Sequence, residues 1–187
     1  MWSKDKKLLE DRLADSLKGK IEYVMEGGHK FSFGITHKVS IKYLKETMVD
    51  FKESLSGYVS YYESIERRNL EESVWTREET DQLYLKAQHT LWNEEIYTPH
   101  TFFQGMTGYL SLSISDALNH EEWMIRLFAI LDKRCGKRTL IKLGDVINTY
   151  PKMLRKFYAL RLDNEGIAYN YDGEGNLVLT KRQDKGD

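Results

Sequence analysis

The spacing of apolar residues changes along this chain, and this change constrains the fold more than any other feature. Val39, Ile41 and Tyr43 alternate with polar residues, which is the period-two pattern of a strand with one buried face. After residue 76, apolar residues instead recur every three or four positions, as on one face of a helix. The sequence therefore predicts an α+β fold, with an N-terminal helix and a small antiparallel sheet followed by a mostly helical C-terminal region.

The N-terminal part holds one predicted helix and one predicted hairpin. Ser3 as the N-cap, leucines spaced four residues apart and Gly19 at the stop position predict a helix over residues 3–18. Gly27 and Gly28 separate two runs rich in β-branched and aromatic residues, which predicts a hairpin with its turn at these glycines.

Residues 44–54 allow two interpretations. Their apolar residues continue into a stripe that steps by three and four, as on one long helix. Alternatively, residues 47–51 pair back on residues 38–43 as a strand. Gly57 would weaken a continuous helix by about 1 kcal/mol relative to Ala. We therefore favour strand to about residue 51 and helix from about 55 to 68.

Helix-end signals divide the remainder of the chain. The predicted starts are Thr76, Thr98-Pro99, Asn119 with Glu122, and Pro151, and the predicted ends include Gly136 and Gly166. A further helix is predicted around residues 140–147. We expect one domain over residues 1–187, subdivided into the helix and small sheet (1–54), the helical region (55–166) and a short hairpin or flexible tail (167–187).

Composition excludes several classes of protein. An aromatic share of 12% is too high for intrinsic disorder, and a single cysteine excludes an intrachain disulfide framework. The first residues are charged where a signal peptide would be apolar, and no run approaches 18 apolar residues. We expect a cytoplasmic protein with no membrane partner.

Charge is strongly segregated, and it points to one candidate site. Residues 63–122 carry a net charge of -8, whereas residues 123–162 carry +8. Blocks of opposite sign can neutralise each other on folding or present separate faces to partners. The predicted anion- or partner-binding residues surround Gly136, which we expect to make a sharp turn with left-handed backbone angles. We call them the basic cluster: Lys133, Arg134, Lys137, Arg138 and Lys142.

Sequence motifs for common chemistries are missing. The chain has no Walker A, GxSxG, GxGxxG or HExxH motif, and its five histidines show no ligand spacing. We therefore assign no catalytic residue, cofactor or metal. Cys135 lies among four cations, which would favour a thiolate, but Ile141 stands where a phosphatase-type loop needs arginine. We favour a buried, dispensable cysteine.

Several short blocks together resemble a family of small uncharacterised bacterial proteins. The resemblance implies a bacterial cytosolic protein and strand pairing across residues 38–51, and it brings no established activity. The blocks are Met1-Trp2-Ser3-Lys4, Leu17-Lys18-Gly19, Leu112–Leu118, Leu131–Arg134, Gly136–Leu140, Phe157–Leu162 and Glu165-Gly166-Ile167.

These observations favour a non-enzymatic protein-interaction module, such as an adaptor or an immunity-type inhibitor, with a protein partner. The alternative is a nucleic-acid or phosphate-binding protein that uses the basic cluster, which a pI near 6.5 disfavours. A second alternative is an enzyme with an unrecognised site. The sequence leaves the oligomeric state open.

Overall fold

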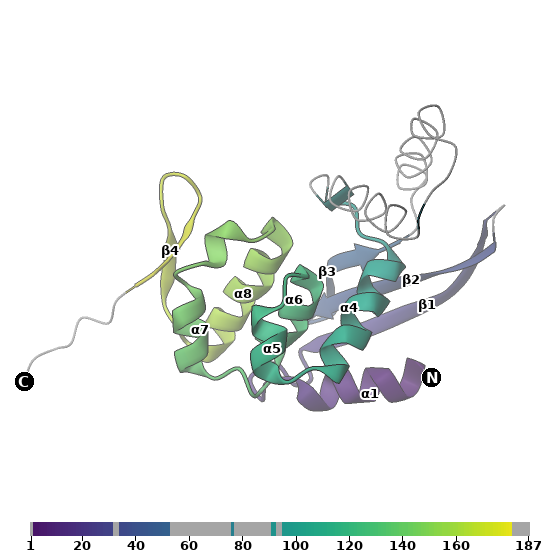
Figure 1. Ribbon diagram of the computed structural model, residues 1–187, viewed down its shortest axis with the longest axis horizontal. Helices are drawn as coiled ribbons and strands as arrows, with labels where there is room; N and C mark the ends of the chain where they lie inside the picture. The colour runs from purple at the N-terminus through teal and green to yellow at the C-terminus, as the bar shows by residue number, and fades with distance from the viewer. Residues whose placement is uncertain (1, 32–33, 53–75, 77–90, 93–94, 181–187) are drawn as a thin grey trace, which may run out of the picture. The chain divides into compact units, whose positions relative to one another are not determined.

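The computed structural model describes residues 2–31, 34–52, 76, 91–92 and 95–180, and it confirms the predicted α+β fold. The described chain forms two compact units, residues 23–103 and residues 1–22 with 104–187 (Figure 1). Among the described residues, no helix is both long enough and apolar enough to cross a membrane.

Three strands form an antiparallel sheet in the order β1-β2-β3. They are β1 (Ile21–Phe31), β2 (Gly34–Tyr43) and β3 (Glu46–Phe51). Pairs such as Val39 with Phe51 and Tyr43 with Glu46 set the register between β2 and β3, which confirms the strand interpretation of residues 47–51. The predicted turn at Gly27 and Gly28 is wrong, because β1 runs through both glycines. Glycine adopts extended angles as readily as turn angles, so a glycine pair alone does not force a turn.

Leu44 and Lys45 form the turn between β2 and β3 with positive φ angles of 50° and 72°. Positive φ at both central positions suits Asn-Gly, whereas side chains such as Leu and Lys are strained there. We expect the double substitution Leu44→Asn/Lys45→Gly to raise the free energy of unfolding by about 1–2 kcal/mol. Urea unfolding of the two proteins checks this, and an unchanged or lower midpoint would contradict the strain argument.

Aromatic packing holds the first turn of α4 (Pro99–Ser111) on this sheet. The ring of Phe102 lies 5.2 Å from that of Phe51 and 6.2 Å from that of Tyr23, and all three side chains are buried. The predicted start of this helix is confirmed, because the backbone N–H of Thr101 donates to the side-chain oxygen of Thr98.

The other unit is mainly helical, and in it α6 packs against both α5 and α8. The predicted last helix is confirmed: α8 follows Pro151 and ends at Gly166, whose φ of 67° lets the N–H of Ile167 reach the carbonyl of Leu162. A predicted short hairpin is also confirmed, as β4 and β5. The elements of this unit, besides α4, are α1 (Trp2–Arg12), α5 (Ile114–Asn119), α6 (Trp123–Leu131), α7 (Lys137–Leu143), a 3-10 turn (Ile147–Thr149), α8 (Lys152–Glu165), β4 (Tyr169–Tyr171) and β5 (Leu177–Leu179).

The predicted end of the N-terminal helix is wrong, because α1 ends at Arg12 and not at residue 18. Long-range backbone hydrogen bonds explain the difference. The N–H of Ala14 donates to the carbonyl of Leu131, and the N–H of Lys133 donates to the carbonyl of Arg12. These bonds use backbone groups that a longer helix would have used itself. Ser3 lies inside α1 and is not its N-cap.

The predicted cap at Asn119 and Glu122 is also wrong. Asn119 is the last residue of a separate short helix, α5, whose N-cap is Ser113. Glu122 precedes α6, but its side chain makes no capping bond. The helix predicted over 55–68 falls outside the described residues, and so does nearly all of the one predicted from Thr76.

Candidate functional site

The basic cluster occupies the loop after α6 and the outer side of α7. The loop turns where the N–H of Cys135 donates to the carbonyl of Asp132. Gly136 then has extended angles, φ -77° and ψ 168°, so the predicted left-handed turn is wrong. A Cβ added there would meet nothing within 4 Å. The turn depends on the hydrogen bonds of Asp132 and not on the freedom of glycine.

Arg134 is held by a buried carboxylate. Asp132 is only 1% exposed, and its Oδ2 accepts from Nη2 of Arg134 at 2.5 Å and from the hydroxyl of Tyr109 at 2.5 Å. Burial opposes ionisation of Asp132, but the hydrogen bonds from Arg134 and Tyr109 outweigh it and lower the pKa of the carboxyl. Arg134 therefore helps to hold the loop in place.

Lys133 and Lys137 contact distant parts of the chain. The ammonium of Lys133 donates to the backbone carbonyl of Asp11 at 3.0 Å. The ammonium of Lys137 donates to the carbonyl of Glu165 at 2.7 Å and lies 3.7 Å from its carboxylate. Lys137 is the first residue of α7, where a cation opposes the helix dipole, and Glu165 offsets that charge. Both lysines are exposed and remain accessible to a partner.

Arg138 and Lys142 differ from the other three cations. Both are exposed, and within the described part of the chain neither makes an ion pair or a side-chain hydrogen bond. They lie four residues apart, so they share one face of α7 with Ile141, whose side chain is 51% exposed. We call these three residues the α7 face. It places an apolar side chain between two unpaired cations.

Cys135 does not have the environment of a nucleophile. The residue is 0% exposed, and burial raises the pKa of its thiol to about 11, although the cation of Arg161 acts in the opposite direction. The prediction of a buried cysteine is confirmed. Thiolate chemistry requires a lowered pKa and access to solvent, and this thiol has neither. In the described ranges, no group of three or more His, Cys, Asp or Glu residues could hold a metal ion.

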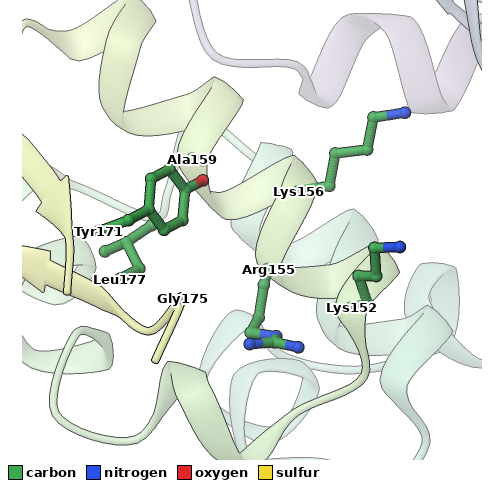
Figure 2. A pocket seen from close by; sticks show the side chains of 7 residues that line it. All are labelled: Lys152, Arg155, Lys156, Ala159, Tyr171, Gly175 and Leu177. Atoms are coloured by element: carbon green, nitrogen blue, oxygen red, sulfur yellow. The ribbon is translucent and has the colours of Figure 1, made fainter. Parts of the chain in front are cut away.

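Sequence reasoning missed a pocket of about 330 Å³ between α8 and the β4–β5 hairpin. Its residues are shown in Figure 2: Lys152, Arg155, Lys156 and Ala159 from α8, and Tyr171, Gly175 and Leu177 from the hairpin. Three cations within five residues after Pro151 were a visible signal of this site. The hairpin side of the pocket could not be predicted, because it depends on tertiary packing.

The described fold and surface define a class of α+β protein with a small antiparallel sheet, a helical unit and an exposed basic surface. The chain belongs to the SF0329 protein family, whose family model matches residues 1–162 and which is an uncharacterised family. Searches of curated proteins and of solved structures found no match.

Proposed function

We propose that the protein is a non-enzymatic, cytoplasmic interaction module whose α7 face binds an acidic surface of a partner protein. The observation that carries this proposal is the arrangement of Arg138, Ile141 and Lys142 on one helix face. Burial of the apolar side chain would supply binding energy, and the two cations would supply charge complementarity. The nearby ammonium groups of Lys133 and Lys137 add to the positive potential.

Charge reversal tests this proposal. We expect Arg138→Glu/Lys142→Glu to weaken partner binding at least about tenfold, because like charges would then face each other across the interface. The melting temperature should hold, since neither side chain has an ion pair to lose in the described structure. Crosslinking in cells followed by mass spectrometry identifies the partner, and titration calorimetry with the purified partner measures its affinity.

The matched control is Lys4→Glu/Lys7→Glu, which reverses two exposed cations on α1. The control should keep the partner that the α7 variant loses, and Ile141→Ser should weaken the same complex several-fold. Equal loss in both charge variants would show a general charge effect and contradict a specific α7 face. A partner retained by the α7 variant would also contradict it.

The positive charge of residues 123–162 supports nucleic acid or phosphate as a second candidate partner. Fluorescence anisotropy with labelled duplex DNA and with single-stranded RNA, at two salt concentrations, tests this candidate. If this binding falls steeply with salt and is lost in Arg138→Glu/Lys142→Glu, the partner of the α7 face is a nucleic acid and not a protein.

A further inference from the structure

We propose that β4 is a self-association edge, at which a second copy of this chain pairs antiparallel with the strand and joins the two hairpins into one continuous sheet. The proposal uses the β4–β5 hairpin and none of the residues of the α7 face, so it does not depend on the proposed function. Three features carry it: the free backbone groups of β4, the closed edge of β5, and a strand sequence that complements itself.

The outer edge of β4 has backbone groups without partners in the described structure. Along an antiparallel pair, residues whose N–H and C=O groups face the other strand alternate with residues whose groups point away from it. The N–H of Thr180 donates to the carbonyl of Ala168, so Ala168 is a residue of the first kind. This alternation turns the backbone groups of Tyr169 and Tyr171 outward, and among the described residues these groups have no backbone bond outside the hairpin.

The outer edge of β5 is closed by a side chain. The amide of Asn148 accepts from the N–H of Leu177 through Oδ1 and donates through Nδ2 to the carbonyl of the same residue, both at 2.9 Å. At this point the amide occupies the place of a neighbouring strand, which is one way in which proteins protect a sheet edge. Of the two edges of the hairpin, β4 is therefore the open one. Pairing through β4 uses the same surface of both copies, so we expect a closed dimer and not a fibre.

The sequence of β4, Tyr169-Asn170-Tyr171, reads the same in both directions. In antiparallel pairing about a two-fold axis at Asn170, Tyr169 of each copy lies opposite Tyr171 of the other, and their outward N–H and C=O groups exchange hydrogen bonds. Cross-strand aromatic pairs of this kind stabilise a sheet. Tyr171 is 59% exposed, and its ring packs edge-on against that of Tyr169 at 5.7 Å between centroids. A second copy would add its own tyrosines beside this exposed ring.

Charge is compatible with this arrangement. Asp172 would lie opposite Ala168 of the second copy, and its carboxylate accepts from the N–H groups of Glu174 and Asn176 within its own hairpin turn. Asn170 is exposed and uncharged, and it would face itself across the axis at the close spacing of a pair without backbone bonds. A charge placed at residue 170 would therefore meet its own copy only in the dimer.

Sedimentation equilibrium of the purified full chain measures this association. We expect a concentration-dependent dimer with a dissociation constant between about 10 µM and 0.3 mM, in keeping with a small interface. Asn170→Lys should raise the constant at least about tenfold, because like charges then lie directly opposite each other. The matched control is Ser115→Lys, which adds the same charge at an exposed position of α5 and should leave the constant unchanged.

A backbone variant separates strand pairing from ring packing. Proline is tolerated at a strand edge where its missing N–H would face solvent, so Tyr171→Pro should keep the hairpin and remove one outward donor from each copy. Tyr171→Val removes the ring and keeps that donor. We expect the proline variant to weaken the dimer at least about fivefold more than the valine variant. Raising the concentration of the wild-type protein should also slow amide hydrogen exchange at Tyr169 and Tyr171, but not at Asp172, whose N–H donates to the carbonyl of Asn176 within the hairpin.

Four results would overturn the proposal. They are a protein that stays monomeric up to about 1 mM, an equally stable dimer in Asn170→Lys, equal effects of Tyr171→Pro and Tyr171→Val, and association that continues beyond the dimer. Circular dichroism confirms that each variant is folded before its association is compared. If Tyr171→Pro disrupts the hairpin, Asn170→Lys and the exchange rates of the wild-type protein decide the outcome.

Discussion

Asp132→Ala is expected to lower the free energy of unfolding by about 3 kcal/mol. The substitution removes the buried acceptor of the Tyr109 hydroxyl and of the Arg134 side chain, and it also removes the acceptor of the Arg134 backbone N–H. Urea unfolding near pH 7 measures the change. Asp11→Ala is the matched control, because this exposed residue accepts the Lys133 bond through its backbone carbonyl, which the variant keeps. A surface substitution of this kind changes stability by less than about 0.5 kcal/mol.

The same carboxyl predicts an effect of acid. The folded-state pKa of Asp132 is lowered, so its contribution is present above the unfolded pKa near 4 and is lost as the pH falls through the folded value. The stability difference between the wild-type protein and Asp132→Ala should therefore shrink below about pH 4. A difference that stays constant into acid would mean that the ionised form contributes nothing.

Alkaline pH is expected to destabilise the protein through Cys135. The unfolded thiol titrates near 9 and the folded thiol at about 11, so the folded state keeps a proton that the unfolded state releases. The stability contribution is complete below pH 9 and is lost as the pH rises to 11. Between pH 8 and 10.5, titration of this thiol alone should lower the free energy of unfolding by about 2 kcal/mol. Burial also raises the pKa of Tyr97 to about 12, which extends the loss to higher pH.

Cys135→Ala isolates the contribution of the thiol. This variant should lose about 1 kcal/mol at pH 8 through the small cavity that it leaves, but its stability should fall less steeply in alkali. The two curves of unfolding free energy against pH should converge and then cross near pH 10. Parallel curves would show that the thiol does not couple folding to proton release. The wild-type protein and Cys135→Ala should bind the partner with equal affinity at pH 7, as expected if the buried cysteine is dispensable.

Local sequence patterns correctly predicted the helix ends that are capped by residues close by in the sequence. Thr98 before Pro99 begins α4, and Gly166 ends α8, because in each case neighbouring residues satisfy the backbone groups at the helix end. Alternation at Val39 and Ile41 similarly predicted the strand that pairs with β3. Prediction failed where distant residues decide the outcome, as at Arg12, where α1 ends because the chain pairs with residues 131–133.

The candidate site shows the same difference between features set by neighbouring residues and features set by distant ones. The cation-rich surface could be predicted from residue type alone, because charged side chains stay exposed unless they are paired. Which cations are paired depends on distant groups, such as the carboxylate of Glu165 for Lys137. The pocket depends on the packing of Tyr171 beside α8, which no short pattern encodes. The predicted role of the basic cluster stays a prediction until a partner is measured.

The pairing of α1 with the loop after α6 has a consequence during synthesis. Asp11 and Lys133, which the pairing joins, lie 122 positions apart in the chain. At roughly 5–20 residues per second, a ribosome needs roughly 6–24 s to make the intervening segment. During that interval Leu13, which is buried in the folded protein, lacks Asp132, the residue with which it forms a β-bridge. The nascent chain therefore carries an apolar segment that a chaperone can bind before the fold closes.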